Sequence, residues 1–303
     1  MDVQFGHPSG QKLLEDISAV FSLEESIFER KEKYTLFVCG GEVGESANSN
    51  RAHFLKWAEK ELTDVIPLVA EQAYRESYSD RSPEFINLGK FEQLVAGVCD
   101  CVLIFPESVG SYAELGLFSA YAPLKKKVLV ANEAEYHNKD SFLNLGPVQN
   151  IDSSSLFRST IPINRSGLLE GFFAVKERLD RLRRRSNRRV FHYKAYSQLP
   201  IEDKLVAIAA TINFLRAVTL GGLAQSIKTT FKAVNKRELQ HLLSILVAQR
   251  YVLRSGEYFM LNPVTKPFVQ FERISAADLM GRATLYYTQH QPRALEHLRN
   301  LAT

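Results

Sequence analysis

The sequence predicts an α/β protein, in which a Rossmann-like open parallel sheet is followed by a smaller, helical winged helix-turn-helix domain. Three observations lead to this fold class. Short apolar runs alternate with amphipathic helical patterns in the first half, helices and one hairpin follow Pro200, and the net charge changes sign between the halves. A length of 303 residues also suggests about two domains.

Strands of the front half are expected where apolar and β-branched residues cluster and then stop at turn residues such as Gly40-Gly41. Four segments meet this description, although Pro67 weakens the second: 34–39, 64–69, 101–105 and 127–131. Helical spacing of apolar residues predicts helices at 51–62, 85–98 and 111–120. Strands separated by helices imply right-handed crossovers and a parallel sheet, which binds ligands beyond the carboxyl ends of its strands.

The back half begins with a helix from about Leu168 that runs into an arginine-rich stretch, 178–189. Further helices are expected at 203–218, from about 221, and at 235–249, followed by two strands around Ser255-Gly256. Helices followed by a small hairpin predict a winged helix-turn-helix. The division expected from these patterns is a front domain at 1–165, a basic helical linker at 166–199 and a winged-helix domain at 200–303.

Charge separates the two halves. Residues 1–150 hold 14 Lys and Arg against 23 Asp and Glu, whereas residues 151–303 hold 24 against 11, so that net charges of −9 and +13 give the total of +4. A basic back half favours a polyanionic partner. The residues expected to contact nucleic acid are Arg181, Arg184, Arg185, Arg188, Arg189, Lys228, Lys232, Lys236, Arg237 and Arg254. The alternatives are a solvated helix face with a linker and a winged helix that binds protein.

Composition excludes several classes. With 45% hydrophobic residues the chain is neither disordered nor collagen-like, and three cysteines are too few for a disulfide scaffold. We expect a cytoplasmic protein, because the first residues carry no apolar signal-peptide stretch and no apolar run is long enough to span a membrane. The seven histidines are scattered, so no metal site is predicted.

The most specific segment runs from Asp100 to Gly116, where a strand leads through a Gly/Ser turn into a helix. Glu114 falls in the first turn of that helix, and Ser111 is placed to cap it or to bind a phosphate or ribose hydroxyl. A carboxylate at this edge of a sheet can attack or stabilise a sugar C1′ as an N-glycosidic bond breaks. On the pattern alone, an ordinary acidic residue that stabilises a helix start is the better explanation.

Residues 105–116 resemble the nucleophile loop of the nucleoside 2-deoxyribosyltransferases, in which a Gly-Thr/Ser turn precedes a Glu followed by Leu-Gly. The resemblance places Glu114 on the catalytic glutamate and Asp100 on an acidic position common in that family. Val38–Gly41 takes the place of the family's first-strand turn, without its proline. We therefore expect Glu114 and Asp100 as catalytic residues. The residues expected to bind substrate are Cys39, Gly40, Gly41, Glu107, Ser108, Gly110 and Ser111.

The whole chain is more similar still to the effector toxins of type II retrons, bacterial anti-phage systems. Residues 37–43, 105–116 and 144–148 resemble their landmarks in the same order, and the basic middle and the tail match too. The resemblance implies cleavage of an N-glycosidic bond, with NAD⁺ or a (deoxy)nucleotide as substrate and no bound cofactor. It also implies inhibition by the retron reverse transcriptase with its multicopy RNA–DNA hybrid (msDNA), which the tail grips, and assembly into a homo-oligomer or filament.

Two other functions compete with this prediction. The first is a nucleotide phosphoribohydrolase resembling the "lysine decarboxylase-like" proteins, whose Pro-Gly-Gly-x-Gly-Thr-x-x-Glu turn is similar to Pro106 and Gly110–Glu114 without the double glycine. The second is a DNA-binding regulator whose front domain senses a nucleotide without turning it over. Loss of turnover in a Glu114→Gln variant separates an enzyme from such a sensor.

Overall fold

The computed structural model describes residues 4–23, 26–29, 34–44, 46–71, 73–74, 87–183, 188–264, 269–270 and 276–302. The chain forms two compact units. The first, here called the sheet unit, comprises Glu32–Gln72 and Arg81–Ser186, and the second, the helical unit, comprises Met1–Lys31, Ala73–Asp80 and Asn187–Thr303. Each is described by itself. No helix among the described residues combines the length and the apolar character needed to cross a membrane.

The sheet unit is built on five parallel strands, four of which the sequence predicts. In chain order they are β2 (Tyr34–Cys39), β3 (Val65–Leu68), β4 (Cys101–Ile104), β5 (Val128–Glu133) and β6 (Ile161–Ile163). Their order across the sheet is β3-β2-β4-β5-β6. Pro67 lies in β3, an edge strand, where a missing N–H is tolerated. The order reverses between β2 and β4, which is where an open α/β sheet forms its ligand crevice.

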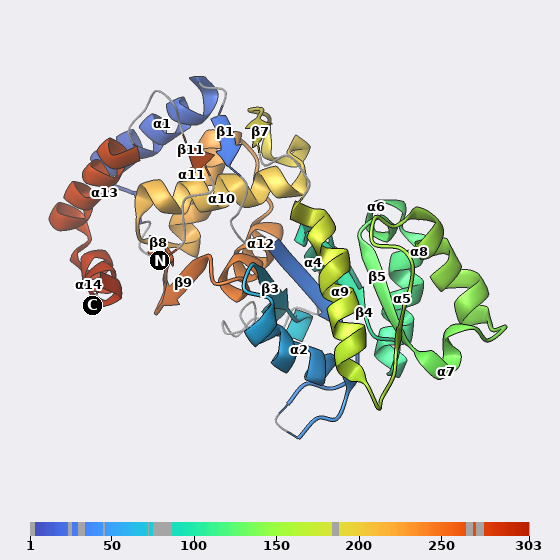
Figure 1. Cartoon of the computed structure of the whole chain (residues 1–303). Coiled ribbons are helices and arrows are strands. Elements are labelled where there is room, and N and C mark those ends of the chain that lie inside the picture. The colour runs from blue at the N-terminus through green and yellow to red at the C-terminus, as the bar shows by residue number, and fades with distance from the viewer. Residues whose placement is uncertain are drawn as a thin grey trace. The chain divides into compact units, whose positions relative to one another are not determined.

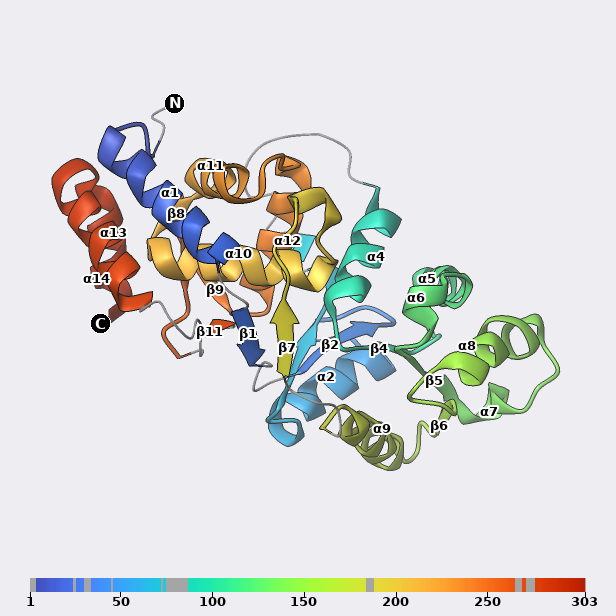
Figure 2. The ribbon, with the colours of Figure 1, turned by 90° about the horizontal axis from the view of Figure 1, so that it is seen from above.

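Helices cover both faces of this sheet (Figures 1 and 2). Helices α2 (Asn50–Glu61) and α9 (Leu168–Arg183) pack on one face, where Leu36 and Val38 join the main core. Helices α4 (Leu88–Val98) and α5 (Val109–Ala120) lie on the other, where Phe118 of α5 packs against Phe37 of β2 with ring centroids 6.2 Å apart. Because side chains alternate along a strand, Cys39, two residues after Phe37, lies on the same face of the sheet and faces α4 and α5. Such strands are apolar throughout because both their faces are buried.

Shorter helices complete the carboxyl half of the sheet unit. They are α6 (Ala122–Lys125), α7 (Ala134–His137), the π-helix η1 (Asn144–Val148) and α8 (Gln149–Ser154). The sequence analysis predicted neither these helices nor β6. Helix α9 is also part of this unit, because Phe172, Val175 and Leu179 are buried in its core. The segment expected to be a linker from residue 166 is therefore built into the sheet unit as far as α9 extends.

The helical unit contains the elements predicted after Pro200 and several more. They are η2 (Tyr196–Gln198), α10 (Ile201–Leu215), β8 (Val218–Thr219), α11 (Leu220–Phe231), α12 (Lys236–Ala248), β9 (Val252–Ser255), β10 (Tyr258–Leu261), α13 (Ala276–His290) and α14 (Pro292–Ala302). Strands β9 and β10 form the predicted hairpin, whose turn residue Gly256 has a φ of 59°. Strand β8 joins this hairpin in a sheet of order β8-β10-β9.

The N-terminal segment also belongs to the helical unit, which differs from the division at residue 165. Helix α1 (Pro8–Leu23) packs against α11 and α13, and β1 (Ser26–Glu29) pairs with β7 (Arg188–Phe191) and β11 (Val269–Gln270). Gln4 accepts a hydrogen bond from the Thr219 backbone N–H at 2.8 Å and donates one to the Ala217 carbonyl oxygen at 3.2 Å. The helical unit is thus assembled from both ends of the chain.

Candidate active site

The site of interest lies at the carboxyl ends of β2 and β4, the two strands between which the strand order reverses. Cys39 pairs in register with Ile104, so the Gly40-Gly41 turn lies beside the turn that leads from β4 into α5. The two sequence motifs therefore meet at the carboxyl edge of the sheet, where a parallel sheet binds ligands. This arrangement also places the first turns of α2 and α5 at that edge.

Glu107 joins the two turns through its carboxylate. Oε1 accepts hydrogen bonds from the Gly41 and Arg51 backbone N–H groups at 2.9 and 3.0 Å, and Oε2 accepts one from the Asn50 N–H at 2.7 Å. The carboxylate therefore caps the N-terminus of α2, where negative charge is favoured. We expected Glu107 to bind substrate, but both of its oxygens are engaged within the fold.

The two glycines allow the helix to come this close. A Cβ atom on Gly40 would lie 2.7 Å from Cβ of Arg51, and one on Gly41 would lie 2.7 Å from Cβ of Ser49. Both separations are shorter than side chains tolerate. The need for glycine at these positions thus follows from the approach of α2, apart from the substrate-binding role that was expected for both residues.

Ser108 and Ser111 form a capping box at the start of α5. Ser108 Oγ accepts from the Ser111 N–H at 3.2 Å, and Ser111 Oγ accepts from the Glu107 and Ser108 N–H groups at 3.0 and 2.9 Å. Ser108 also donates to the Gly40 carbonyl oxygen at 3.2 Å. Of the two roles considered for Ser111, the structure shows the capping one, with Ser108 as the N-cap and Ser111 as the third residue of the helix, and the Ser111 side chain is buried. Gly110 is exposed in the first turn of α5.

Glu114, the candidate catalytic residue, projects from α5 toward the end of β2. It lies in the second turn of α5, not in the first as expected, because the helix begins at Val109. Burial, followed by the nearby Glu92 carboxylate, raises the pKa of Glu114 from 4.5 to about 7, although Arg51 opposes the shift. The Cys39 thiol donates a hydrogen bond to the Glu114 carboxylate. The carboxylate therefore changes its charge near neutral pH and is held by a residue that the sequence analysis placed in the substrate site.

Arg51 is a further site residue, which the sequence analysis missed. Its side chain is 5% exposed, and its guanidinium forms a bidentate ion pair with Glu71, with nitrogen–oxygen distances of 3.0 and 2.8 Å. Its Nη1 also lies 3.3 Å from the Gly41 carbonyl oxygen, and its Nε has no partner among the residues that the structure describes. Such a buried cation needs carboxylate neighbours.

Glu92 of α4 was missed as well. Burial raises the pKa of its carboxyl group, and the nearby Glu71 adds to the shift. The signal for both residues was weak: Arg51 opens a predicted helix ten positions after Gly41, and Glu92 follows the buried Phe91 in an amphipathic helix. Three glutamates thus lie near one arginine, so the site carries an excess of negative charge once Glu92 and Glu114 are ionised.

Asp100 lies at the opposite end of β4. Its Oδ2 accepts hydrogen bonds from the Thr35 N–H at 2.8 Å and from Thr35 Oγ1 at 3.1 Å, at the start of β2. Glu114 lies beyond the carboxyl end of the same strand, roughly 15 Å away along a strand of this length. The fold therefore separates the two residues that we expected to act together, and Asp100 fits the role of a strand-end anchor.

The residues expected to contact nucleic acid lie in both units. Arg181 of α9 donates to the carbonyl oxygens of Leu156 and Arg158 at 2.6 and 3.1 Å. Arg254 of β9 is half-buried, and its Nε donates to the Gly256 carbonyl oxygen at 3.1 Å. Lys228, Lys232, Lys236 and Arg237 are exposed at the end of α11 and the start of α12. Arg184 and Arg185 lie outside the described residues, as do the side chains of Arg188 and Arg189.

Comparison with known proteins identifies the family of this chain. The model of the STM3845 retron effector protein family matches residues 47–254, which is more than half of the chain and includes parts of both units. The chain belongs to this family. Among the described residues no cluster of His, Cys, Asp and Glu suited to a metal ion occurs.

Two relatives from Escherichia coli are similar to part of the chain. "Retron Ec86 putative ribosyltransferase/DNA-binding protein" is 32% identical over 117 residues, which are 39% of this chain and 37% of the relative. Its counterpart from retron Ec73, named in the same words, is 29% identical over 124 residues, which are 41% of this chain and 39% of the relative. The chain thus spans less than half of the length of either relative.

Proposed function

We propose that this chain is the toxic effector of a retron anti-phage system and that its sheet unit cleaves an N-glycosidic bond. The observation that carries the proposal is the setting of Glu114. A carboxylate with a pKa near 7 lies at the ligand-binding edge of a parallel sheet, hydrogen-bonded to Cys39 and close to Arg51. Raised pKa values and such positions are typical of catalytic groups. The ribosyltransferase names of the two relatives support the same chemistry.

The charge of the site favours NAD⁺ over a neutral deoxynucleoside as substrate. Glu71, Glu92 and Glu114 outnumber Arg51, so the site attracts positive charge where it develops. In NAD⁺ the nicotinamide nitrogen already carries that charge, and the sugar gains it as the bond breaks. A (deoxy)nucleotide whose base leaves without a formal positive charge would use the same carboxylate and remains the second candidate.

The proposed step needs no further reagent than water. The C1′–N bond breaks, its electron pair stays on nicotinamide, which leaves as a neutral molecule, and the ionised Glu114 stabilises or captures the cationic C1′. Water then adds to C1′ and loses a proton to a site carboxylate, for which Glu92, the carboxylate with the largest effect on the pKa of Glu114, is a candidate. The products are free nicotinamide, ADP-ribose and one proton.

Other residues position this carboxylate. Glu107 and the capping box of Ser108 and Ser111 fix the two turns, and Cys39 orients Glu114 through its thiol. The ion pair of Arg51 with Glu71 keeps a cation buried beside the site. We propose that Gly40, Gly41 and Gly110 contribute backbone that the substrate can approach.

For the tail we propose a winged-helix module that binds nucleic acid. The order α10, β8, α11, α12, β9, β10 and the antiparallel sheet β8-β10-β9 support this assignment. Exposed Lys236 and Arg237 lie in the first turn of α12, and the relatives are named as DNA-binding proteins. We propose the reverse transcriptase with its msDNA as the partner that holds the toxin inactive, within a homo-oligomer or filament.

Product analysis tests the proposed reaction. The purified chain is incubated separately with NAD⁺ and with deoxynucleosides, beside the Glu114→Gln variant and the matched control Glu59→Gln, an exposed position on α2. We expect chromatography to show nicotinamide from wild type and Glu59→Gln and none from Glu114→Gln. Base release from deoxynucleosides alone would replace NAD⁺ as the substrate. Release by Glu114→Gln at the wild-type rate would exclude the proposed site.

A further inference from the structure

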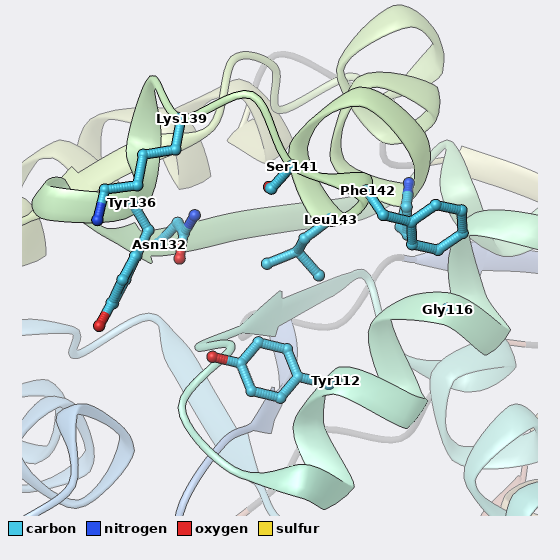
Figure 3. Close-up of a pocket in the computed structure, with 9 residues that line it drawn as sticks. Tyr112, Gly116, Asn132, Tyr136, Lys139, Ser141, Phe142 and Leu143 are labelled. Atoms are coloured by element: carbon cyan, nitrogen blue, oxygen red, sulfur yellow. The ribbon is translucent and has the colours of Figure 1, made fainter.

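A pocket lies on the flank of α5 that faces away from Glu114 (Figure 3). Tyr112 and Gly116, one helical turn apart, line this pocket, whereas Glu114 is two residues from each and therefore points to the opposite side. Its volume is about 460 Å³, which is within the range of small-molecule sites. The end of β5, helix α7 and the segment leading into η1 form its other walls.

The walls of the pocket are largely apolar and aromatic. The ring of Tyr112 lies below Leu143 in Figure 3, and Phe142 and Pro147 extend the same lining. A Cβ atom placed on Gly116 would meet no atom within 4 Å, so the glycine leaves space there. Phe142 is 87% exposed, which marks the pocket as open at this rim. A flat aromatic ring suits such a space.

Two polar side chains add chemical selectivity. Asn132, at the carboxyl end of β5, is 1% exposed, and its Nδ2 donates to Asn144 Oδ1 at 3.4 Å. Its Oδ1 has no donor within the described part of the chain. Lys139 is the charged residue among those that line the pocket, and its ammonium lies 4.5 Å from the centroid of the Tyr136 ring.

Hydrogen bonds of Asn144 fix the side of the pocket that carries Tyr136 and Lys139, without any ligand. Its Nδ2 donates to the carbonyl oxygens of Tyr136 and Lys139 at 2.6 and 2.8 Å, and its backbone N–H donates to Ser141 Oγ at 3.3 Å. One amide therefore fixes the turn that carries both the tyrosine and the lysine. A wall held in this way costs little ordering entropy when a ligand binds.

We propose that this pocket binds a nucleotide, separate from the substrate at Glu114. The base stacks on the tyrosine rings, the Asn132 amide reads its edge, and the Lys139 ammonium neutralises its phosphate. An amide can both accept from and donate to a base edge, and stacking on aromatic side chains is the usual way in which proteins hold bases. Lys139 favours a ligand with negative charge, because it is the charged residue among those that line the pocket, whereas the Glu135 carboxylate, which accepts a hydrogen bond from the Tyr136 hydroxyl, lies outside that lining.

This inference does not depend on the proposed reaction. None of the residues lining the pocket is among the groups that shift the pKa of Glu114. The test therefore uses the full chain carrying Glu114→Gln, which prevents turnover. Calorimetry measures binding of AMP, GMP, CMP and UMP, with adenosine and inorganic phosphate as separate probes.

Gly116 provides the matched variants. Gly116→Phe fills the pocket, whereas Gly116→Ala adds one methyl group into open space and improves the helix. We expect at least one nucleotide to bind equally well to the parent and to Gly116→Ala, and at least tenfold more weakly to Gly116→Phe. Tyr136→Ala, which retains the backbone that Asn144 holds, should weaken the same nucleotide by about tenfold through lost stacking.

Lys139→Gln distinguishes the contribution of the phosphate to binding from that of the nucleoside. We expect it to weaken the nucleotide by about tenfold and to leave adenosine unchanged, as loss of a charge-assisted contact to phosphate predicts. Nucleotide binding that survives Gly116→Phe and Tyr136→Ala would place the ligand elsewhere and overturn the inference. Absence of any nucleotide binding would also overturn it. If Gly116→Phe then abolished self-association instead, the pocket would be a protein-docking surface.

Discussion

Replacement of Glu107 tests whether its carboxylate holds the two turns of the site together. The carboxylate accepts the backbone N–H groups of Gly41, Asn50 and Arg51, all of which are buried residues. Glu107→Ala leaves three donors without acceptors, at a cost of about 1–3 kcal/mol for each one that water cannot reach. We expect the free energy of unfolding to fall by roughly 3–5 kcal/mol in Glu107→Ala and by about 2 kcal/mol in Glu107→Gln, which keeps one accepting oxygen.

Tryptophan fluorescence during urea unfolding measures this effect in the sheet unit alone. Trp57, the single tryptophan of the chain, lies in α2 and packs against Phe54 and Phe172 with centroid distances of 5.6 Å. With a urea dependence of about 2 kcal/mol per molar, Glu107→Gln should lower the midpoint by about 1 M. Glu59→Gln, at an exposed position of the same helix, should leave it unchanged. Midpoints of both Glu107 variants within about 0.25 M of wild type would refute the reasoning.

Three further predictions address charge and assembly. Because the pKa of Glu114 is about 7, ionisation should raise kcat/KM roughly tenfold between pH 6 and 8, with a midpoint that Glu92→Gln lowers. Gln4→Ala removes the acceptor of the Thr219 N–H and should lower the melting temperature of the full chain by several degrees, measured by circular dichroism. Lys236→Gln should weaken binding to msDNA and reduce the slope of log affinity against log salt by about one, measured by filter binding.

Each of these predictions has an outcome that contradicts it. A rate that stays constant from pH 5 to 8 would mean that Glu114 ionises near its ordinary pKa of 4.5 or takes no part. An unchanged melting temperature for Gln4→Ala would show that the N-terminal segment does not stabilise the helical unit. A salt slope that Lys236→Gln leaves unaltered would place the phosphate contacts on other residues.

The pKa of Glu114 also predicts how stability depends on pH. Its folded-state pKa lies above its ordinary value of 4.5, so the unfolded chain loses the proton first as the pH rises. The folded state is therefore penalised progressively between about pH 4.5 and 7, and the penalty is complete above pH 7. Glu114→Gln removes this penalty, so the variant should be more stable than wild type at pH 8. Catalytic carboxylates commonly lower the stability of the folded state in this way.

The sheet and the position of Glu114 could be predicted because their signals are local. Strands buried on both faces are continuous apolar runs, which makes them easy to recognise in the sequence. The strand–turn–helix pattern around Gly110 and Ser111 then puts Glu114 on the helix that follows β4, near the carboxyl edge of the sheet. The capping role of Ser111 follows from the same pattern. The parallel order also brings the ends of β2 and β4 together once the crossovers are right-handed.

The remaining features depend on contacts that sequence spacing does not reveal. Arg51 is buried because Glu71, twenty residues away, meets its guanidinium. Glu107 turns back onto the start of α2 instead of facing a ligand, which depends on how close that helix approaches. Asp100 was given a catalytic role by analogy with the deoxyribosyltransferases. Its distance from Glu114 becomes clear only from the length of β4, which separates the two residues. Gln4 accepts a hydrogen bond from the Thr219 N–H, although the two residues are 215 positions apart in the sequence.

The turnover rate of Glu114→Gln, compared with wild type and Glu59→Gln at pH 8, tests the central claim most directly. The substitution keeps the size of the side chain and removes only the charge, and its folding is checked by Trp57 fluorescence. The account predicts that Glu114→Gln releases nicotinamide at least about a thousandfold more slowly, while Glu59→Gln retains the wild-type rate. A Glu114→Gln rate within tenfold of wild type would show that another residue carries the reaction.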